Sequence, residues 1–220
     1  MKKYLVTIFI LMATQCKAQK HSWEYGFQTG VNINSARGNG VSSSSKRSLA
    51  GFGAGGHLQY MLNSHLGIKA GLQFDQLGWS YHSLTLYGSG TSIFSTADAL
   101  FRLNYLDLPV TAQYTSGKKI RFTSGAGIFI GTLLSGKFIL KTKTPDASTT
   151  KSKHKGTKTF NFGIAANAGI QIPLQHKLKL DMGIHNNLGL FNTQKKINDY
   201  STTSIRTNAL SFLVGLTWKM

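Results

Sequence analysis

Apolar and polar residues alternate with a period of two over most of the chain after about residue 20. In the clearest stretch, 160–172, every second position is Phe, Ile or Ala, and the positions between them are mostly Asn, Gly and Gln. Such alternation indicates a β-strand with one apolar and one polar face, because successive side chains of a strand point to opposite sides. Eight segments show this pattern: 25–33, 51–60, 66–75, 105–114, 120–130, 160–172, 178–190 and 210–220.

The connections between these segments alternate between short and long. Three are tight turns, at 61–64, 115–118 and 173–177. Four are long and polar, at 35–47, 82–97, 135–158 and 192–207. This rhythm is typical of an up-and-down barrel in a bacterial outer membrane, where the periplasmic turns are short and the extracellular loops are long.

The composition of the two faces decides what surrounds the strands. The apolar face is aliphatic or aromatic over five to seven consecutive positions, whereas the other face mixes Gly, Asn, Gln and Thr with few ionisable groups. A soluble barrel places apolar residues inside and polar residues outside. A soluble β-sandwich, the alternative, would expose many more charges. The pattern therefore predicts an all-β fold, an eight-stranded antiparallel transmembrane β-barrel with its apolar face in lipid and no open sheet edge.

The N-terminus has the layout of a secretory signal peptide. Lys2 and Lys3 precede an apolar run of about ten residues, too short for a membrane helix of roughly 20 residues. We expect cleavage after Ala18, which makes 1–18 the signal peptide and 19–220 the barrel domain. Cys16 is the one cysteine, so the mature chain has neither a disulfide nor a thiolate site. Lipidation at Cys16 would need a small preceding residue, and Gln15 is not small.

Two motifs resemble the PorT-like outer-membrane β-barrel family of Bacteroidetes, loosely called porin family proteins. The stretch from Leu103 to Pro109, LNYLDLP, is similar to that family's LNYLEIP strand. Gly125-Ala126-Gly127 followed by Gly131 is similar to its glycine-rich strand, although the tail ends in Met220 where an aromatic residue is usual. The resemblance implies Sec export, a multi-pass barrel in the outer membrane and, for PorT itself, a link to protein secretion.

Eight ionisable residues fall on the polar face of the predicted strands and should point into the lumen. An eight-stranded barrel has an interior just wide enough for side chains to fill it, so we expect these groups to pair as a polar plug. A proton or ion path is the alternative. The residues are His57, Lys69, Asp75, Asp107, Arg121, Lys179, Asp181 and His185.

The third long loop carries much of the chain's net charge of +18. We expect its lysines to bind anionic lipopolysaccharide or other anionic surface polymers through screened, salt-sensitive contacts, unless the loop is only a solvated segment. The absence of aromatic residues between the lysines argues against stacking on nucleic-acid bases. The lysines are Lys141, Lys143, Lys151, Lys153, Lys155 and Lys158, opposed within the loop by Asp146.

The residue pattern does not favour metal or catalytic chemistry. His57 and His185 have amides two positions on, where a strand would need a second ligand. Catalytic pairs at the barrel rim would have to come from residues in or beside the outer loops. Because these loops are rich in Ser and Thr, such pairs arise easily by chance. The candidate residues are His82, Asp98, His154 and Asp199. We therefore expect no cofactor, no metal and no catalytic residue.

The favoured function is a monomeric, non-enzymatic outer-membrane barrel that stabilises the membrane, contacts surface material or takes part in secretion. Its partners would be outer-membrane lipid and lipopolysaccharide, anionic surface polymers or other envelope proteins, without specific nucleic acid. Two alternatives stay open: a small-solute channel, and a lipid or peptide hydrolase at the barrel rim.

Overall fold

The computed structural model describes residues 22–39, 46–87, 93–142, 149–153, 156–194 and 204–220. The predicted signal peptide, 1–18, lies outside them. Within the described residues, no helix is long and apolar enough to cross a membrane. The strands of this part of the chain are β1 (Ser22–Arg37), β2 (Lys46–Met61), β3 (Leu66–Tyr87), β4 (Ile93–Ser116), β5 (Arg121–Thr142), β6 (Thr149–Lys153), β7 (Phe160–Gln175), β8 (Leu178–Gly189) and β9 (Arg206–Lys219).

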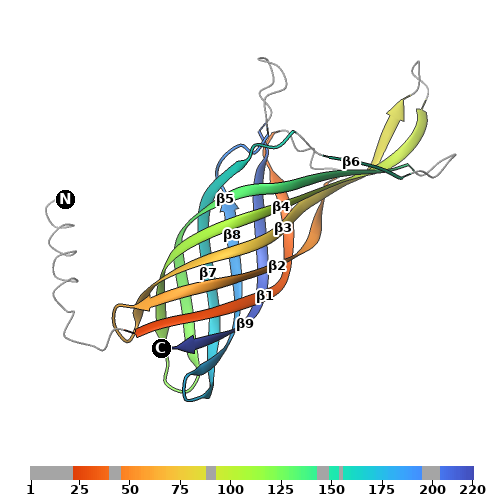
Figure 1. The fold of residues 1–220 in the computed structure, drawn as a ribbon. Coiled ribbons are helices and arrows are strands. Elements are labelled where there is room, and N and C mark those ends of the chain that lie inside the picture. Colours follow the sequence, from red (N-terminus) through yellow and green to blue (C-terminus); the bar gives the residue numbers. More distant parts are fainter. Residues whose placement is uncertain (1–21, 40–45, 88–92, 143–148, 154–155, 195–203) are drawn as a thin grey trace, which may run out of the picture.

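The strands form one antiparallel sheet that closes on itself. Their order is β4-β3-β2-β1-β9-β8-β7-β5-β6, and pairing of β4 with β5 completes a ring of eight strands. The short strand β6 pairs only with one end of β5, outside the ring. The twisted, tilted cylinder is plain in Figure 1. The predicted eight-stranded barrel is confirmed, with β6 as an addition that the sequence pattern did not indicate.

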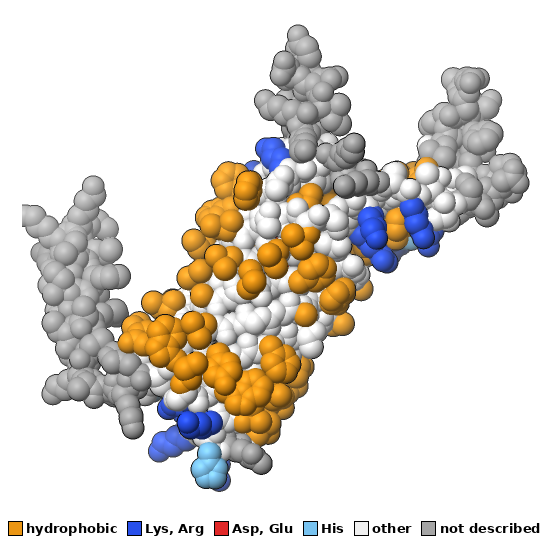
Figure 2. All heavy atoms as spheres, in the orientation of Figure 1, with side chains coloured by type: hydrophobic (Ala, Val, Ile, Leu, Met, Phe, Trp, Pro, Cys, Tyr) orange, Lys and Arg blue, Asp and Glu red, His pale blue; other side chains and the backbone are white. Residues whose placement is uncertain are grey.

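The alternation predicted from the sequence separates the inside from the outside of the barrel. In β1, Glu24 and Asn32 are buried, whereas Phe27 and Val31 are 51% and 60% exposed. Phe27 and Val31 lie on the outer face of the sheet, and the inner face fills the narrow interior of the barrel. The exposed apolar side chains form a belt around the cylinder (Figure 2).

One end of the barrel carries the three tight turns and is called the turn end here; the other is the loop end. In the β2–β3 turn, the Asn63 side-chain oxygen accepts hydrogen bonds from the backbone N–H groups of His65 and Leu66, at 2.8 and 2.7 Å. In the β4–β5 turn, Gly117 has a φ of +109°, a conformation that residues with a Cβ rarely adopt. These local devices explain why the predicted turns are short.

Two of the predicted long loops are wrong in part, because strands continue through them. β3 and β4 stay paired well beyond the last β2 partner, and β5 continues beyond its last pair with β7. We call this extension the projecting sheet: residues 82–87, 93–104, 133–142 and 149–153. It leaves the barrel at the upper right of Figure 1, beside the label of β6. The extension forms because apolar residues such as Leu84 and Phe138 keep the two-residue period inside segments that otherwise look polar.

Candidate functional site

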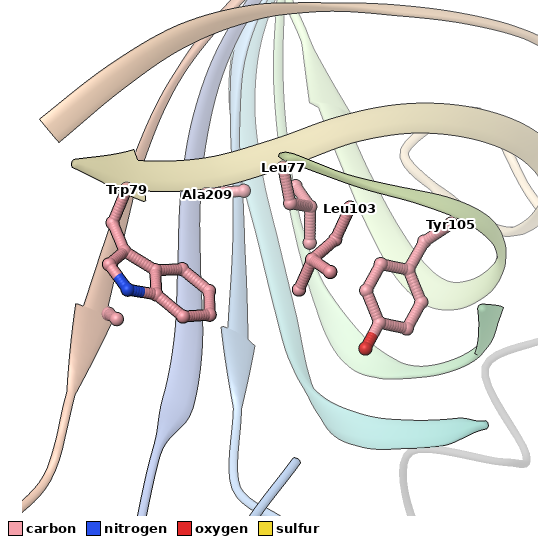
Figure 3. Close-up of a cluster of buried hydrophobic side chains, with 6 residues drawn as sticks. Leu77, Trp79, Leu103, Tyr105 and Ala209 are labelled. Atoms are coloured by element: carbon pink, nitrogen blue, oxygen red, sulfur yellow. The ribbon is translucent and has the colours of Figure 1, made fainter. Parts of the chain in front are cut away.

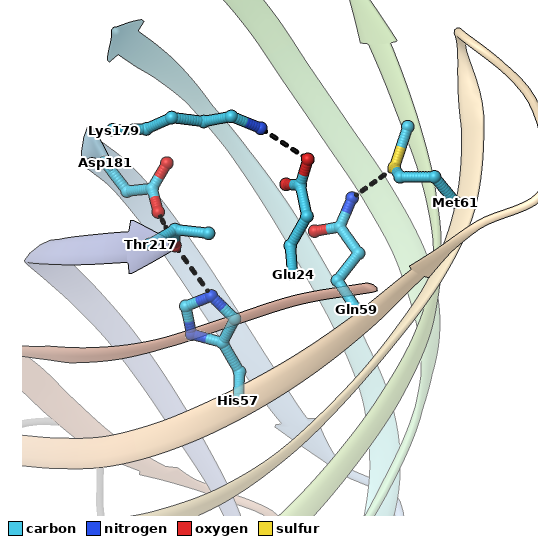
Figure 4. Close-up of polar contacts among 7 residues, drawn as sticks. All are labelled: Glu24, His57, Gln59, Met61, Lys179, Asp181 and Thr217. Carbon is cyan, nitrogen blue, oxygen red and sulfur yellow. Dashed lines mark hydrogen bonds and ion pairs between the residues drawn. The ribbon is translucent and has the colours of Figure 1, made fainter. Parts of the chain in front are cut away.

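A buried ion pair lies in the lumen near the turn end. Lys179 Nζ on β8 donates a hydrogen bond to Glu24 Oε1 on β1 at 2.6 Å, and both residues are less than a tenth exposed (Figure 4). Lys179 was predicted to face the lumen, but Glu24 was not, because the first predicted strand began one residue after it. Glu24 lies four residues before Gln28 and therefore on the same face of the strand, which is the signal that could have identified it.

A second group of contacts joins β2, β8 and β9 beside this pair. The Thr217 hydroxyl donates to the Asp181 carboxylate, and His57 Nε2 lies 3.0 Å from the same hydroxyl oxygen (Figure 4). A hydroxyl has one hydrogen, so the hydrogen in the second bond comes from His57. The structure therefore selects the His57 tautomer with its proton on Nε2. Thr217 is the central member, and the sequence pattern gave it no role.

Lys69 on β3 completes the charge balance of the lower lumen. It interacts electrostatically with Asp181 and Glu24 and lines the same interior cavities as His185. Two lysines thus face two carboxylates, a neutral arrangement that limits the cost of burying charge.

The middle of the lumen is an amide network around two buried carboxyl groups. Asp75 Oδ1 accepts hydrogen bonds from Gln73 Nε2 at 3.0 Å and from Asn32 Nδ2 at 3.3 Å. Asp107 lies beside Asp75 on the neighbouring strand and is 1% exposed. A Cβ at Gly131 would overlap the Asp107 carboxylate, so glycine there makes room for it.

Arg121 lies apart from the other predicted lumen residues. It lines a pocket of about 230 Å³ at the turn end, together with Glu24 and Lys219. The structure therefore places seven of the eight predicted residues inside the barrel and Arg121 at its mouth. Among the described residues, no three His, Cys, Asp or Glu side chains lie together as a metal site would require.

An apolar cluster occupies the lumen at the loop end, where the sequence pattern predicted polar residues throughout. Leu77 and Trp79 of β3 meet Leu103 and Tyr105 of β4, and all four are at most 4% exposed (Figure 3). Ala209 of β9 contacts them from across the barrel. We call this cluster the apolar plug. The strand phase could have revealed it, since Leu77 and Trp79 follow Asp75 on the inward face.

Little free volume remains between the charged groups and the apolar plug. The two interior cavities that contain Lys69 measure about 30 and 20 Å³. A water molecule needs roughly 10–15 Å³ by this measure, so each cavity admits no more than about two waters. In the part of the barrel that the structure describes, side chains therefore leave little free volume around Lys69.

The projecting sheet has one apolar and one basic face. Inward, the Phe101 and Phe138 rings lie 4.9 Å apart, and Trp79 stacks on Phe101 at 5.2 Å. Outward, Arg102 and Lys137 are direct cross-strand neighbours and both are exposed. Figure 2 shows Lys and Arg side chains gathered there, with no acidic side chain visible among the coloured residues of this face.

Three of the six predicted loop lysines, Lys141, Lys151 and Lys153, belong to strands of the projecting sheet. Lys141 and Lys151 are exposed on β5 and β6, and Lys153 is in register with Lys137. Lys158 is exposed just before β7, whereas Lys143 and Lys155 lie outside the described residues. The sequence pattern missed Arg102 and Lys137 as members of this basic face.

His82 and Asp98 come together on the projecting sheet. His82 Nδ1 lies 3.3 Å from Asp98 Oδ2, and the Ser83 backbone N–H donates to Asp98 Oδ1 at 3.0 Å. Ser83 has a φ of +55°, unusual for a residue with a Cβ. The short bulge between β3 and β4 at this point brings the two side chains together. The two other loop residues considered for catalysis, His154 and Asp199, lie outside the described residues.

Comparison with known proteins connects this geometry to a family. A family model described as "Outer membrane protein beta-barrel domain" matches residues 15–195. No curated protein matches the sequence.

Solved structures of low sequence identity share the fold. Neisserial surface protein A is 13% identical with a TM-score of 0.50, over 92% of this chain and all of that one. A major outer membrane protein from Thermus thermophilus is 12% identical with a TM-score of 0.51, over 92% and 100%. The outer membrane protease OmpT from Escherichia coli is 10% identical with a TM-score of 0.42, over 93% and 100%. At these identities the similarity to the first two structures establishes the fold alone, and no conclusion is drawn from the third.

Proposed function

Because this chain belongs to the outer membrane protein beta-barrel domain family, we propose that this outer-membrane protein is a closed scaffold that presents a basic β-sheet at the cell surface. The loop end of such a barrel faces outward. The proposal has two parts: the barrel does not conduct solutes, and the projecting sheet binds an anionic partner through its outward face.

The filled lumen supports the first part. Charged groups pair near the turn end, amides surround Asp75 in the middle, and the apolar plug closes the loop end. A solute would need a continuous polar path wider than the two small cavities. This arrangement favours a scaffold over a small-solute channel.

The outward face of the projecting sheet carries the second part. Of the seven Asp and Glu residues in the chain, four are inside the barrel: Glu24, Asp75, Asp107 and Asp181. Among the described residues outside the lumen, Asp98 is the one acid, while Lys141 and Lys151 are exposed near it. Because the acids lie mainly inside and the lysines outside, the surface is positive and attracts polyanions. Salt weakens this attraction by screening the charges.

We extend this proposal to the protein's origin, export and partners. The PorT-like motifs favour an origin in Bacteroidetes, export by a cleaved signal peptide and a role beside protein secretion, with envelope proteins as further partners. A monomeric, non-enzymatic protein fits a rigid barrel whose exposed chemistry is cationic. The pair of His82 and Asp98 motivates one check of the enzyme alternative: incubation with lipid A should release no acyl chains.

We expect cells that display this protein to bind dextran sulfate, and the Lys141→Gln/Lys151→Gln variant to bind it about tenfold more weakly. The loss follows from two exposed charges, each contributing up to about 1 kcal/mol near a polyanionic surface. Fluorescent dextran sulfate titrated onto whole cells at several salt concentrations measures the affinity and its salt dependence.

The matched control is Lys118→Gln/Lys119→Gln at the turn end, which removes the same charge on the opposite side of the membrane. Its affinity for dextran sulfate should equal that of the wild type, and neutral dextran should bind neither protein. Equal affinity of the Lys141→Gln/Lys151→Gln variant and the wild type would exclude the projecting sheet as the contact surface.

A further inference from the structure

Two cross-strand pairs of like charge lie on opposite sides of the barrel near the loop end. Arg102 of β4 faces Lys137 of β5, and Arg37 of β1 faces Arg206 of β9. Two strands separate the pairs in either direction around the ring. All four side chains are exposed on the outward face. Like charges directly opposite each other destabilise a sheet, so an anion bound between the two cations would relieve their repulsion.

The protein itself supplies little compensation. In the part of the chain that the structure describes, no acid pairs with Arg102, Lys137 or Arg206. Arg37 donates a hydrogen bond to the Gly189 carbonyl oxygen at 3.1 Å, which fixes the side chain but leaves its charge unpaired. Both pairs therefore retain unpaired positive charge on the outward face.

On the β4–β5 side, the basic pair lies just beyond the apolar belt. Asn104 hydrogen-bonds Ser135 at 2.9 Å and Gln76 at 3.5 Å, so an outward polar row ends the belt above Phe74 and Leu106. Arg102 and Lys137 are the next outward residues, two positions and about 7 Å further along their strands. If the apolar belt spans the hydrocarbon core, cations just beyond it lie at the level of the lipid headgroups.

The β1–β9 side repeats the same order. Ile33 and Leu210 are the last apolar pair, Ser35 and Asn208 form the next pair, and Arg37 and Arg206 follow. Asn186 Nδ2 donates to Asn208 Oδ1 at 3.0 Å and so extends this polar row onto β8. Two opposite walls thus show one sequence of layers: apolar belt, hydrogen-bonded polar row, paired cations.

We propose that Arg37, Arg206, Arg102 and Lys137 form a collar that binds the phosphate groups of a phosphorylated glycolipid in the outer leaflet. Guanidinium groups bind phosphate oxygens through paired, charge-assisted hydrogen bonds, and three of the four residues are arginines. Arg102 and Lys137 are the part of the basic face nearest the barrel, and Arg37 and Arg206 lie outside that face. Lys141 and Lys151, which test polyanion binding, lie further out on the projecting sheet. It depends on the outer-membrane location alone.

The outer wall below Arg206 also fits a lipid better than a soluble polymer. A shallow apolar hollow of about 560 Å³ is lined by residues of β5, β7, β8 and β9, among them Ala168, Met182 and Phe212. Phe212 is six residues from Arg206 on the same strand, about 20 Å along it. An acyl chain beneath a collar-bound headgroup would reach this hollow.

Native mass spectrometry of the detergent-purified protein tests the collar with bisphosphorylated lipid A as the probe. The wild type should retain lipid A, and the Arg102→Gln/Lys137→Gln and Arg37→Gln/Arg206→Gln variants should each bind it about tenfold more weakly, since each loses two charges near a lipid surface. Lipid A with its phosphates removed should bind the wild type as weakly as intact lipid A binds the variants.

The controls separate the collar from general charge effects and from the proposed function. The variants Lys118→Gln/Lys119→Gln and Lys141→Gln/Lys151→Gln should bind lipid A as tightly as the wild type does. This result is expected even if the wild type does not bind dextran sulfate, so the collar and the proposed function can fail separately. Arg102→Lys/Arg206→Lys keeps the charges and tests binding where a glutamine variant does not fold. Equal binding of intact and dephosphorylated lipid A, displacement by millimolar inorganic phosphate, or equal loss in the turn-end control would overturn the proposal.

Discussion

Replacement of Lys179 by methionine is expected to destabilise the folded barrel by about 3–5 kcal/mol, because it leaves the buried Glu24 carboxylate without its partner. The lysine lies 2.6 Å from that carboxylate inside the lumen, and both residues are less than a tenth exposed. Urea unfolding of the protein refolded into lipid vesicles measures the change in the free energy of unfolding.

The double variant Glu24→Gln/Lys179→Met should recover most of the lost stability, because it removes both charges of the pair together. Lys219→Met, at an exposed position near the same end of the barrel, should change the stability by less than about 0.5 kcal/mol. A loss below 1 kcal/mol for Lys179→Met would show that the ion pair does not contribute as the structure indicates.

An arginine in the middle of the apolar belt is the second large perturbation. Val214 of β9 faces outward and is 47% exposed. We expect Val214→Arg to cost about 2–4 kcal/mol in a bilayer, because a charge at the midplane loses its hydration. The same unfolding measurement in vesicles gives the cost.

Asn208→Arg is the matched control, on the same strand and face but in the polar row that ends the belt. Its cost should fall to about 0–1 kcal/mol. A soluble sandwich would show no such gradient along the strand, so equal costs at the two positions would contradict the assignment of the belt to lipid.

The sequence predicts the ring of strands well because the signal is local. A strand such as β7 alternates apolar and polar residues with a period of two, and this order follows directly from the strand geometry. The pairing of the first strand with the last, β1 with β9, follows in turn from the requirement that a sheet in lipid has no open edge. Neither inference needs knowledge of which residues meet across the barrel.

The contents of the lumen were only partly predictable, because they depend on register between distant strands. Glu24 and Lys179 are 155 residues apart in the sequence and meet only when the ring closes. Thr217 has no distinctive neighbour in the sequence, yet it joins His57 to Asp181. The apolar plug was missed because an inward leucine or tryptophan breaks the rule that membrane barrels have polar interiors.

The basic face on the outside of the protein was also only partly predictable from the sequence. The loop lysines could be recognised as a run of charge in the sequence. Arg102, however, lies between the predicted loop 82–97 and the predicted strand 105–114, and Lys137 is a single cation near the start of the third predicted loop. Their pairing is created by the bulge in β5 near Leu133, which sets the register with β4. The density of charge along the chain therefore identifies a basic loop, whereas the register between strands determines which cations become neighbours.

Single-channel recording in planar bilayers tests the closed scaffold most directly. With the purified protein inserted, the filled lumen and the apolar plug predict no steady open steps in concentrated KCl at moderate voltage. A gel with and without boiling should show the mobility change of a closed barrel and so establishes that the inserted protein is folded. Reproducible open steps from the folded wild-type barrel would contradict the account and would favour the channel instead.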